Sequence, residues 1–148
     1  MKNFTLIVLV ILSLHILGCS HTQNLSSRFN VTLTSGGGFT GMYNGYYIDT
    51  LGEISRWEGR TYNLASLKPG GKLTPDKLKE MNTKITELEL LNVQYNKSGN
   101  ISSSISISTN ISKHTVSWVG VEPEEEVPEK IKEFYYYIKN LINNSITK

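Results

Sequence analysis

The carboxyl-terminal segment carries a one-sided apolar stripe, and this feature limits the possible folds most strongly. From Pro128 onward the apolar side chains recur at spacings of three and four residues: Ile131, Phe134, Tyr135, Ile138, Leu141 and Ile142. This spacing places them on one face of an α-helix. Such a face is normally buried against another element, so the stripe predicts a helix that packs on the rest of the chain.

A second amphipathic helix is predicted from position 74. Thr74 has the hydroxyl typical of an N-cap, Pro75 suits the first helical position, and Asp76 lies in the first turn. The apolar residues that follow also share one face: Leu78, Met81, Ile85 and Leu88.

Alternating apolar and polar residues predict strands. Phe29, Val31 and Leu33 alternate with polar residues, and segments 46–57 and 101–119 each have the pattern of a hairpin. Segment 64–72 contains Pro69-Gly70-Gly71 and is expected to be a loop. We predict a single small α+β domain, with an antiparallel sheet of about four to five strands and the two helices on one face.

The composition excludes some classes of protein. The 148 residues suit one domain, and the single cysteine cannot form an internal disulfide. The formal net charge is +2, without a basic patch, so nucleic acid is not an expected partner.

The amino terminus has the pattern of a secretion signal. Lys2 precedes an apolar run at 6–12, and the chain then continues as Ile16-Leu17-Gly18-Cys19. This tetrapeptide resembles the bacterial lipobox. The resemblance implies that the Cys19 thiol receives a diacylglycerol, that the chain is cut before it, and that the new amino group is acylated, with palmitate as an expected acyl group. An ordinary cleaved signal with a chance cysteine is the alternative.

Three segments follow from this interpretation. Residues 1–18 would be the lipoprotein signal peptide, 19–27 a polar tether, and 28–148 the single α+β domain. The resemblance implies a bacterial cell-envelope protein held on the membrane through Cys19. Because Ser20 stands where an aspartate would favour inner-membrane retention, the outer membrane is favoured in a Gram-negative cell.

The sequence offers little for catalysis. His114 is the only histidine inside the predicted domain, and its alternation with Val116 and Trp118 indicates a structural or exposed side chain. The glutamates at 122–129 fit a solvated helix entrance better than an acid–base pair. No histidine or cysteine cluster has metal-ligand spacing. We therefore expect no enzyme, no metal and no cofactor.

A glycine-rich loop is the main candidate site. It comprises Gly36, Gly37, Gly38, Phe39, Thr40 and Gly41. The loop lacks the Gly-Lys-Ser/Thr ending of a phosphate loop. Two interpretations stay open: a bend or bulge at a sheet edge with Phe39 turned into the core, or a recognition loop that presents Phe39.

The order of motifs resembles emfourin, a family of small inhibitors of thermolysin-type metallopeptidases. The residues that carry this likeness are Ser35–Gly41 after a strand, the helix start at 73–76, the segment 114–118 and the final helix after Val127-Pro128. The resemblance implies that the loop enters the protease cleft, that Phe39 fills an apolar subsite, and that the zinc belongs to the target. Segment 52–59 also resembles a hairpin found in uncharacterised envelope lipoproteins.

A non-inhibitory structural or assembly lipoprotein is the second hypothesis. Its protein partner would contact aromatic anchors on the sheet, because tyrosine and tryptophan are typical of interfaces. The candidate interface residues are Tyr43, Tyr46, Tyr47 and Trp57.

Overall fold

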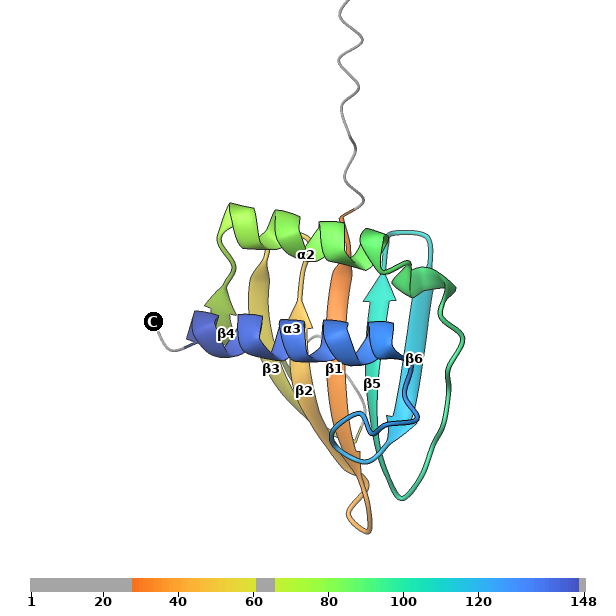
Figure 1. Cartoon of the computed structure of the whole chain (residues 1–148). Helices are drawn as coiled ribbons and strands as arrows, with labels where there is room; N and C mark the ends of the chain where they lie inside the picture. Colours follow the sequence, from red (N-terminus) through yellow and green to blue (C-terminus); the bar gives the residue numbers. More distant parts are fainter. Residues whose placement is uncertain (1–27, 61–65, 147–148) are drawn as a thin grey trace, which may run out of the picture.

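Six strands form one antiparallel sheet in the computed structural model, which describes residues 28–60 and 66–146 (Figure 1). The spatial order is β4-β3-β2-β1-β5-β6, so β1 is a central strand paired on both sides. The strands are β1 (Asn30–Gly37), β2 (Met42–Ile48), β3 (Glu53–Gly59), β4 (Lys68–Lys72), β5 (Ile101–Ser108) and β6 (Lys113–Val119).

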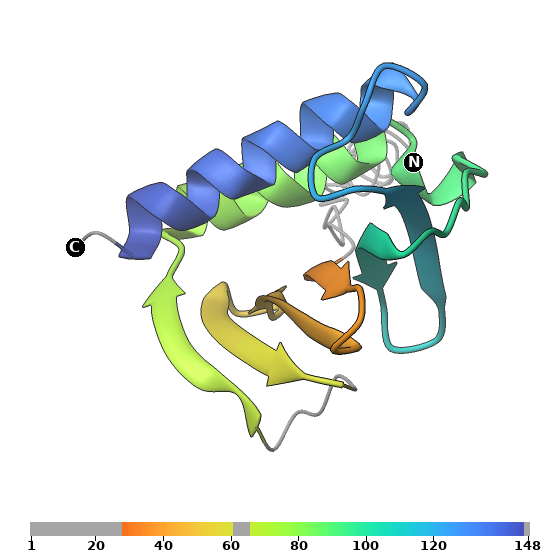
Figure 2. The same ribbon diagram turned by 90° about the horizontal axis from the view of Figure 1, so that it is seen from below.

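Two α-helices lie side by side on one face of this sheet (Figure 2). They are α2 (Pro75–Glu87) and α3 (Glu129–Ile146), and a short 3₁₀ helix, η3 (Leu90–Asn92), follows α2. The predicted α+β class with both helices on one face is therefore confirmed. The expected count of four to five strands is wrong, because the described sheet has six.

The additional strand is β4, in the segment expected to be a loop. It pairs only with β3, at the edge of the sheet, where Pro69 lies opposite Ser55 and Gly71 opposite Ile54. The register shifts between Ile54 and Ser55, as in a β-bulge. An edge strand tolerates proline, since its missing N–H need not pair with a second neighbour.

Local signals predicted both helices correctly. The Thr74 hydroxyl accepts a hydrogen bond from the Lys77 N–H at 3.4 Å, and Pro75 begins α2. On α3 the whole predicted stripe is buried. The ring of Tyr135 on this helix meets Trp118 of β6 edge-on, with centroids 5.4 Å apart. The stripe therefore packs on the sheet, as its spacing requires.

Alternation along β1 directs its apolar residues into the same core. Val31 lies between Ile48 of β2 and Ile107 of β5, and all three are buried. Leu33 is also buried, opposite Ile105. The polar residues between them lie on the face away from the helices.

The strand register defines two ends of the sheet. At one end β1 begins, and the β2–β3 and β5–β6 turns lie beside it; we call this the entry end. At the other end β1 passes into β2, and we call this the hairpin end (bottom of Figure 1). Neither α2 nor α3, the α-helices of the described residues, has the length and apolar content needed to cross a bilayer.

Candidate functional site

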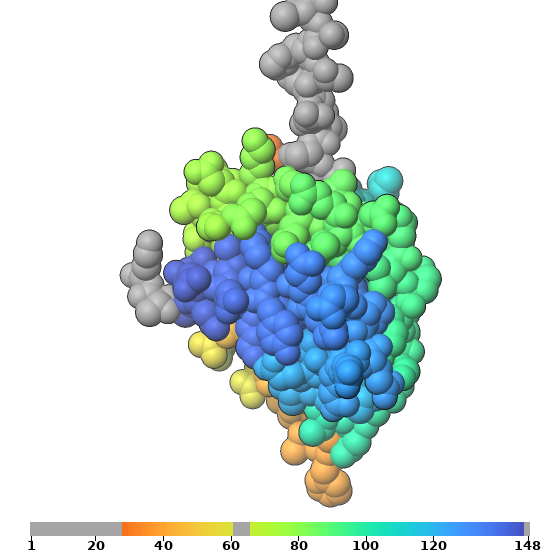
Figure 3. All heavy atoms as spheres, viewed as in Figure 1, coloured from red at the N-terminus to blue at the C-terminus, as the bar shows by residue number. Residues whose placement is uncertain are grey.

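The glycine-rich segment forms the turn between the central strands β1 and β2. The Gly41 N–H donates to the Gly38 carbonyl at 3.2 Å, and the Met42 N–H donates to the Thr40 hydroxyl at 3.3 Å. This hairpin projects beyond the rest of the molecule (Figure 3). It is therefore not a bulge at a sheet edge, as one interpretation of the sequence supposed.

The close pairing of the two strands requires glycine at the base of the hairpin. Gly36 has φ +151°, and a Cβ there would lie 2.2 Å from the Met42 carbonyl oxygen and 2.6 Å from the Tyr43 Cα. Gly37 has φ +108°, and its Cβ would lie 2.6 Å from the Asn100 carbonyl oxygen. Both contacts are with backbone, which cannot rotate away as a flexible side chain can.

Strand β5 holds the other side of the hairpin. Gly37 pairs with Ile101, and the Gly38 N–H donates to the Asn100 carbonyl at 2.5 Å. The Ile101 carbonyl accepts in turn from the Gly120 N–H at 2.9 Å. The base of the loop is thus fixed between two neighbouring strands before any partner binds.

Phe39 lies at the tip of this hairpin and is fully exposed, at 106% of its reference area. The interpretation that placed its ring in the core is therefore wrong. The physical reason is the turn itself: Phe39 stands between Gly38 and the Thr40-Gly41 pair, in a segment beyond the last strand pairing. No core residue reaches this position.

Other apolar side chains are exposed around the hairpin, and with Phe39 they form what we call the hairpin-end cluster. Gly37 pairs with both Met42 and Ile101, which lie on the helix side of the sheet, whereas Val119, opposite Ser102, lies at the same end on the other face. The Val121 carbonyl accepts a hydrogen bond from the Ser103 hydroxyl at 3.0 Å, which places Val121 at this end as well. The cluster comprises Phe39, Met42, Ile101, Val119 and Val121, of which the last four are 39–54% exposed. Sequence reasoning missed these four, because apolar residues at strand ends resemble core residues.

The predicted aromatic anchors do not form one surface. Trp57 is buried, at 5% exposure, on the face away from the helices, where it lies across Gly45. Tyr46 packs against the core on the helix side, with the Arg56 guanidinium 5.9 Å above its ring. Tyr43 is partly buried, on the Trp57 side of the sheet. Trp57 is therefore not an available interface anchor, which corrects the expectation for this residue.

A cleft of about 720 Å³ opens beside Trp57, at the end of the β2–β3–β4 edge. Its charged lining comes from Arg56, Glu58 and Lys68. Neither histidine nor cysteine is among the described residues that line it.

His114 occupies a structural position. Its Nε2 lies 2.9 Å from the Val93 carbonyl oxygen, and Val116 and Trp118 on the same side of β6 are buried. This hydrogen bond connects β6 to the segment after η3. The arrangement agrees with the structural interpretation of the histidine.

Two of the glutamates before α3 are paired with lysines on the surface. Glu122 contacts Lys139, and Glu126 contacts Lys97. The hydrogen bond from Lys97 lowers the pKa of Glu126 below its ordinary value. A general acid needs a raised pKa, so this pairing works against that role. Across residues 28–60 and 66–146 no three histidine, cysteine or acidic side chains are arranged to hold a metal ion.

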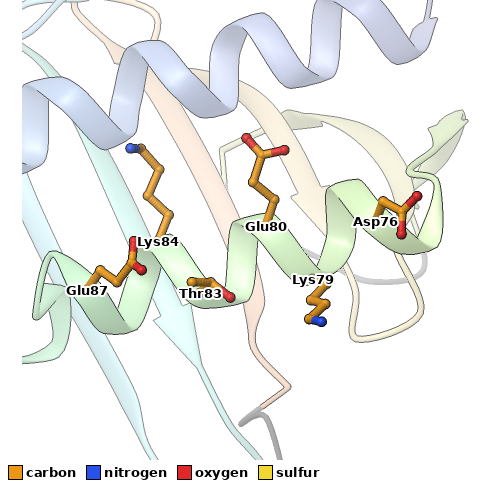
Figure 4. Close-up of a pocket in the computed structure, with 6 residues that line it drawn as sticks. All are labelled: Asp76, Lys79, Glu80, Thr83, Lys84 and Glu87. Carbon is orange, nitrogen blue, oxygen red and sulfur yellow. The ribbon is translucent and has the colours of Figure 1, made fainter.

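A shallow groove of about 350 Å³ runs along α2 (Figure 4). Glu80 and Lys84 point toward α3, where Lys84 pairs with Glu133 at 2.6 Å, whereas Lys79 points away from that helix. Alternating charges line the groove: Asp76, Lys79, Glu80, Lys84 and Glu87. All the residues that line the groove belong to α2, so it is a shallow surface of one helix.

Three of the sequence-based expectations lie outside the described residues, namely the signal at 1–18, the tether at 19–27 and the lipid attachment at Cys19. Comparison with known proteins adds no relative: no protein-family model and no curated protein matches the chain.

Proposed function

We propose that this chain is a lipid-anchored envelope protein whose domain binds a partner protein through the Gly36–Gly41 hairpin. The more specific proposal, which we call the finer proposal, is that the partner is a thermolysin-type metallopeptidase and that binding inhibits it. One observation carries it: Phe39 is fully exposed at the tip of a hairpin whose base is fixed on both sides. This is the geometry needed to present one apolar side chain to a pocket on another molecule.

The hairpin suits insertion into a substrate cleft. A protease binds its substrate as an extended main chain with side chains in subsites. The exposed tip offers Phe39 together with the peptide groups of the turn, which lie beyond the last strand pair. Hydrogen bonds to Asn100 and within the turn order these groups beforehand, which lowers the entropic cost of binding. Burying the phenyl ring would contribute about 2 kcal/mol.

The rest of the hairpin-end cluster supports a contact wider than one side chain. Met42 and Ile101 flank the base of the hairpin, and Val119 lies on the next strand. Interfaces typically surround a central anchor with weaker contacts that exclude water. We assign Phe39 the role of anchor and the other four residues the role of rim.

The placement of the anchor fits this proposal. β1 has eight residues, so its first and last residues are separated by about 24 Å. A lipid on Cys19 would hold the entry end near the bilayer, because Cys19 precedes β1 in the chain. Phe39 would then point away from the membrane.

An inhibition assay tests the finer proposal. A soluble fragment of residues 20–148 is titrated against several thermolysin-type enzymes, and near-stoichiometric, competitive inhibition of at least one is expected. Phe39→Asp should abolish it, because a carboxylate in an apolar subsite is not solvated. Ile111→Asp is the matched control, since Ile111 is 96% exposed at the opposite end, and it should inhibit normally. No inhibition by the unmutated fragment would exclude the protease.

A structural or assembly lipoprotein is the second candidate, favoured by the breadth of the cluster. Val119 and Val121 lie outside the hairpin that a protease cleft would accept. In this case a cell-wall or outer-membrane protein should bind the fragment, and Phe39→Asp should leave that binding intact while Val119→Asp weakens it.

A further inference from the structure

The entry end of the sheet has its own exposed apolar side chains, which the proposed function does not use. Leu51 lies in the β2–β3 turn and is 61% exposed, and Ile111 lies in the β5–β6 turn and is 96% exposed. Both turns are ordered by their own hydrogen bonds. The Asp49 carboxylate accepts from the Leu51 N–H at 2.8 Å, and the Thr109 hydroxyl accepts from the Ile111 N–H at 3.3 Å.

The two turns flank the start of β1. In the order β3-β2-β1-β5-β6, one turn joins the pair on one side of β1 and the other turn joins the pair on the other side. Three strand spacings of about 4.8 Å separate the turn centres, so they lie about 14 Å apart. The chain enters β1 between them. Leu51, Ile111 and the start of β1 therefore lie at one end of the sheet, in one row.

A basic cleft opens beside Leu51. It has a volume of about 340 Å³, and three cationic side chains line it: Arg28, Lys72 and Lys79. Lys72 pairs with Glu53 at 2.5 Å, whereas no ion pair joins Arg28 or Lys79 to a described residue. The apolar part of the lining comes from Leu51, Leu73, Pro75 and Leu78.

The acidic groups at this end leave those two cations available. Asp49 accepts backbone hydrogen bonds from Leu51 and Glu53, and Asp76 lies in the first turn of α2, where the helix dipole favours a negative charge. Lys79 points away from α3, on the side of α2 that borders the cleft (Figure 4). Lys113 adds another exposed cation at the start of β6.

We propose that the entry end rests on a phospholipid bilayer, with Leu51 and Ile111 inserted at the interface and Arg28 and Lys79 against lipid phosphates. The proposal rests on the lipid anchor of the proposed function. Phe29 follows Cys19 by ten residues, a length of chain that spans at most about 35 Å. A lipid on Cys19 would thus keep this end close to the bilayer, where weak apolar and electrostatic contacts add to the anchor.

Docking of this end would fix the orientation of the whole domain. A tether alone would let any face meet the membrane. With two apolar tips about 14 Å apart and the chain entry between them, the strands stand upright on the bilayer. The hairpin end then lies at least the length of β1, about 24 Å, from the lipid surface.

Site-specific fluorescence on the mature, lipid-modified chain tests this orientation. A lipid-modified Cys19 has no free thiol, so an environment-sensitive dye can be attached through Thr50→Cys, Asn110→Cys or Thr40→Cys in separate variants. The first two positions adjoin the tips and leave Leu51 and Ile111 in place, and the third lies in the distant hairpin. The protein is reconstituted in phosphatidylcholine vesicles with phosphatidylglycerol and a lipid-borne quencher.

The dyes at 50 and 110 should be quenched several-fold more than the dye at 40. Combining Leu51→Ser with Ile111→Ser should remove most of this difference, and Arg28→Gln with Lys79→Gln should make it smaller in vesicles with phosphatidylglycerol. Equal quenching at all three positions would overturn the orientation, even if mass spectrometry shows lipid on Cys19. An unmodified Cys19 would instead overturn the anchor and the orientation together.

Discussion

Replacement of Gly36 tests whether backbone packing at the base of the hairpin determines the site. In Gly36→Ala the new methyl group would lie 2.2 Å from the Met42 carbonyl oxygen and 2.6 Å from the Tyr43 Cα, at a φ of +151°. Backbone strain of about 2 kcal/mol and a steric cost of about 2 kcal/mol should lower the free energy of unfolding by about 4 kcal/mol. The hairpin must open to relieve the contact, so partner binding should weaken as well.

Gly41→Ala is the matched control in the same loop. Gly41 has φ +61°, but no atom lies within 4 Å of its ideal Cβ. Only the left-handed conformation is penalised there, at about 1 kcal/mol. Urea denaturation with a slope of about 2 kcal/mol/M should therefore show midpoint shifts of about 2 M for Gly36→Ala and about 0.5 M for Gly41→Ala. Equal shifts would refute the claim that close strand approach requires Gly36.

Three further predictions concern the helices. Ile138→Ala, at a fully buried position on α3, should cost about 3 kcal/mol in thermal or urea unfolding, whereas Ile111→Ala at an exposed turn should change stability by less than about 0.5 kcal/mol. Thr74→Ala removes the acceptor for the Lys77 N–H and should cost about 1 kcal/mol, with loss of helical signal in circular dichroism. Burial, followed by the Glu80 charge, raises the pKa of Tyr137 above its ordinary value of about 10. Its contribution to stability is therefore present below pH 10 and lost as the pH rises further, and Tyr137→Phe should flatten that decline.

For each of these three predictions, one result would contradict it. Similar losses for Ile138→Ala and Ile111→Ala would contradict the assignment of core and surface. An unchanged helical signal in Thr74→Ala would show that the N-cap hydrogen bond does not stabilise α2. A stability profile above pH 10 that is the same with and without the Tyr137 hydroxyl would show that this group does not titrate with unfolding.

Features set by local sequence were predictable, and features set by strand partners were not. The Thr74-Pro75 start of α2 and the buried stripe of α3 depend on spacing within one segment, so the sequence alone predicts them. The strand at 68–72 depends on β3 as a partner, and its Pro-Gly-Gly composition is typical of loops.

The candidate site, too, has some features that local sequence predicted and others that depend on strand partners. Glycine density marked the hairpin, but glycine permits both a buried and an exposed Phe39, so only the pairing of β1 with β2 decided between them. The sequence alone did not predict that the other four residues of the hairpin-end cluster are exposed at the same end of the sheet. Ile101 and Val119 lie at the same end of the sheet as Met42 only because β5 and β6 are in register with the end of β1. Trp57 was misjudged because Gly45, opposite it on β2, has no side chain, and a Cβ there would lie 2.9 Å from the indole Nε1.

Photo-crosslinking from position 39 tests the central claim most directly. The experiment uses the soluble fragment of residues 20–148, in which a photoreactive phenylalanine analogue in place of Phe39 occupies the same exposed tip. The analogue in place of Ile111 is a control of similar exposure at the opposite end. We predict an adduct from position 39 to residues that line the substrate cleft of a thermolysin-type metallopeptidase, and none to that cleft from position 111. A partner that forms adducts only from positions outside the hairpin, with none from position 39, would contradict the role of Phe39 as the binding anchor.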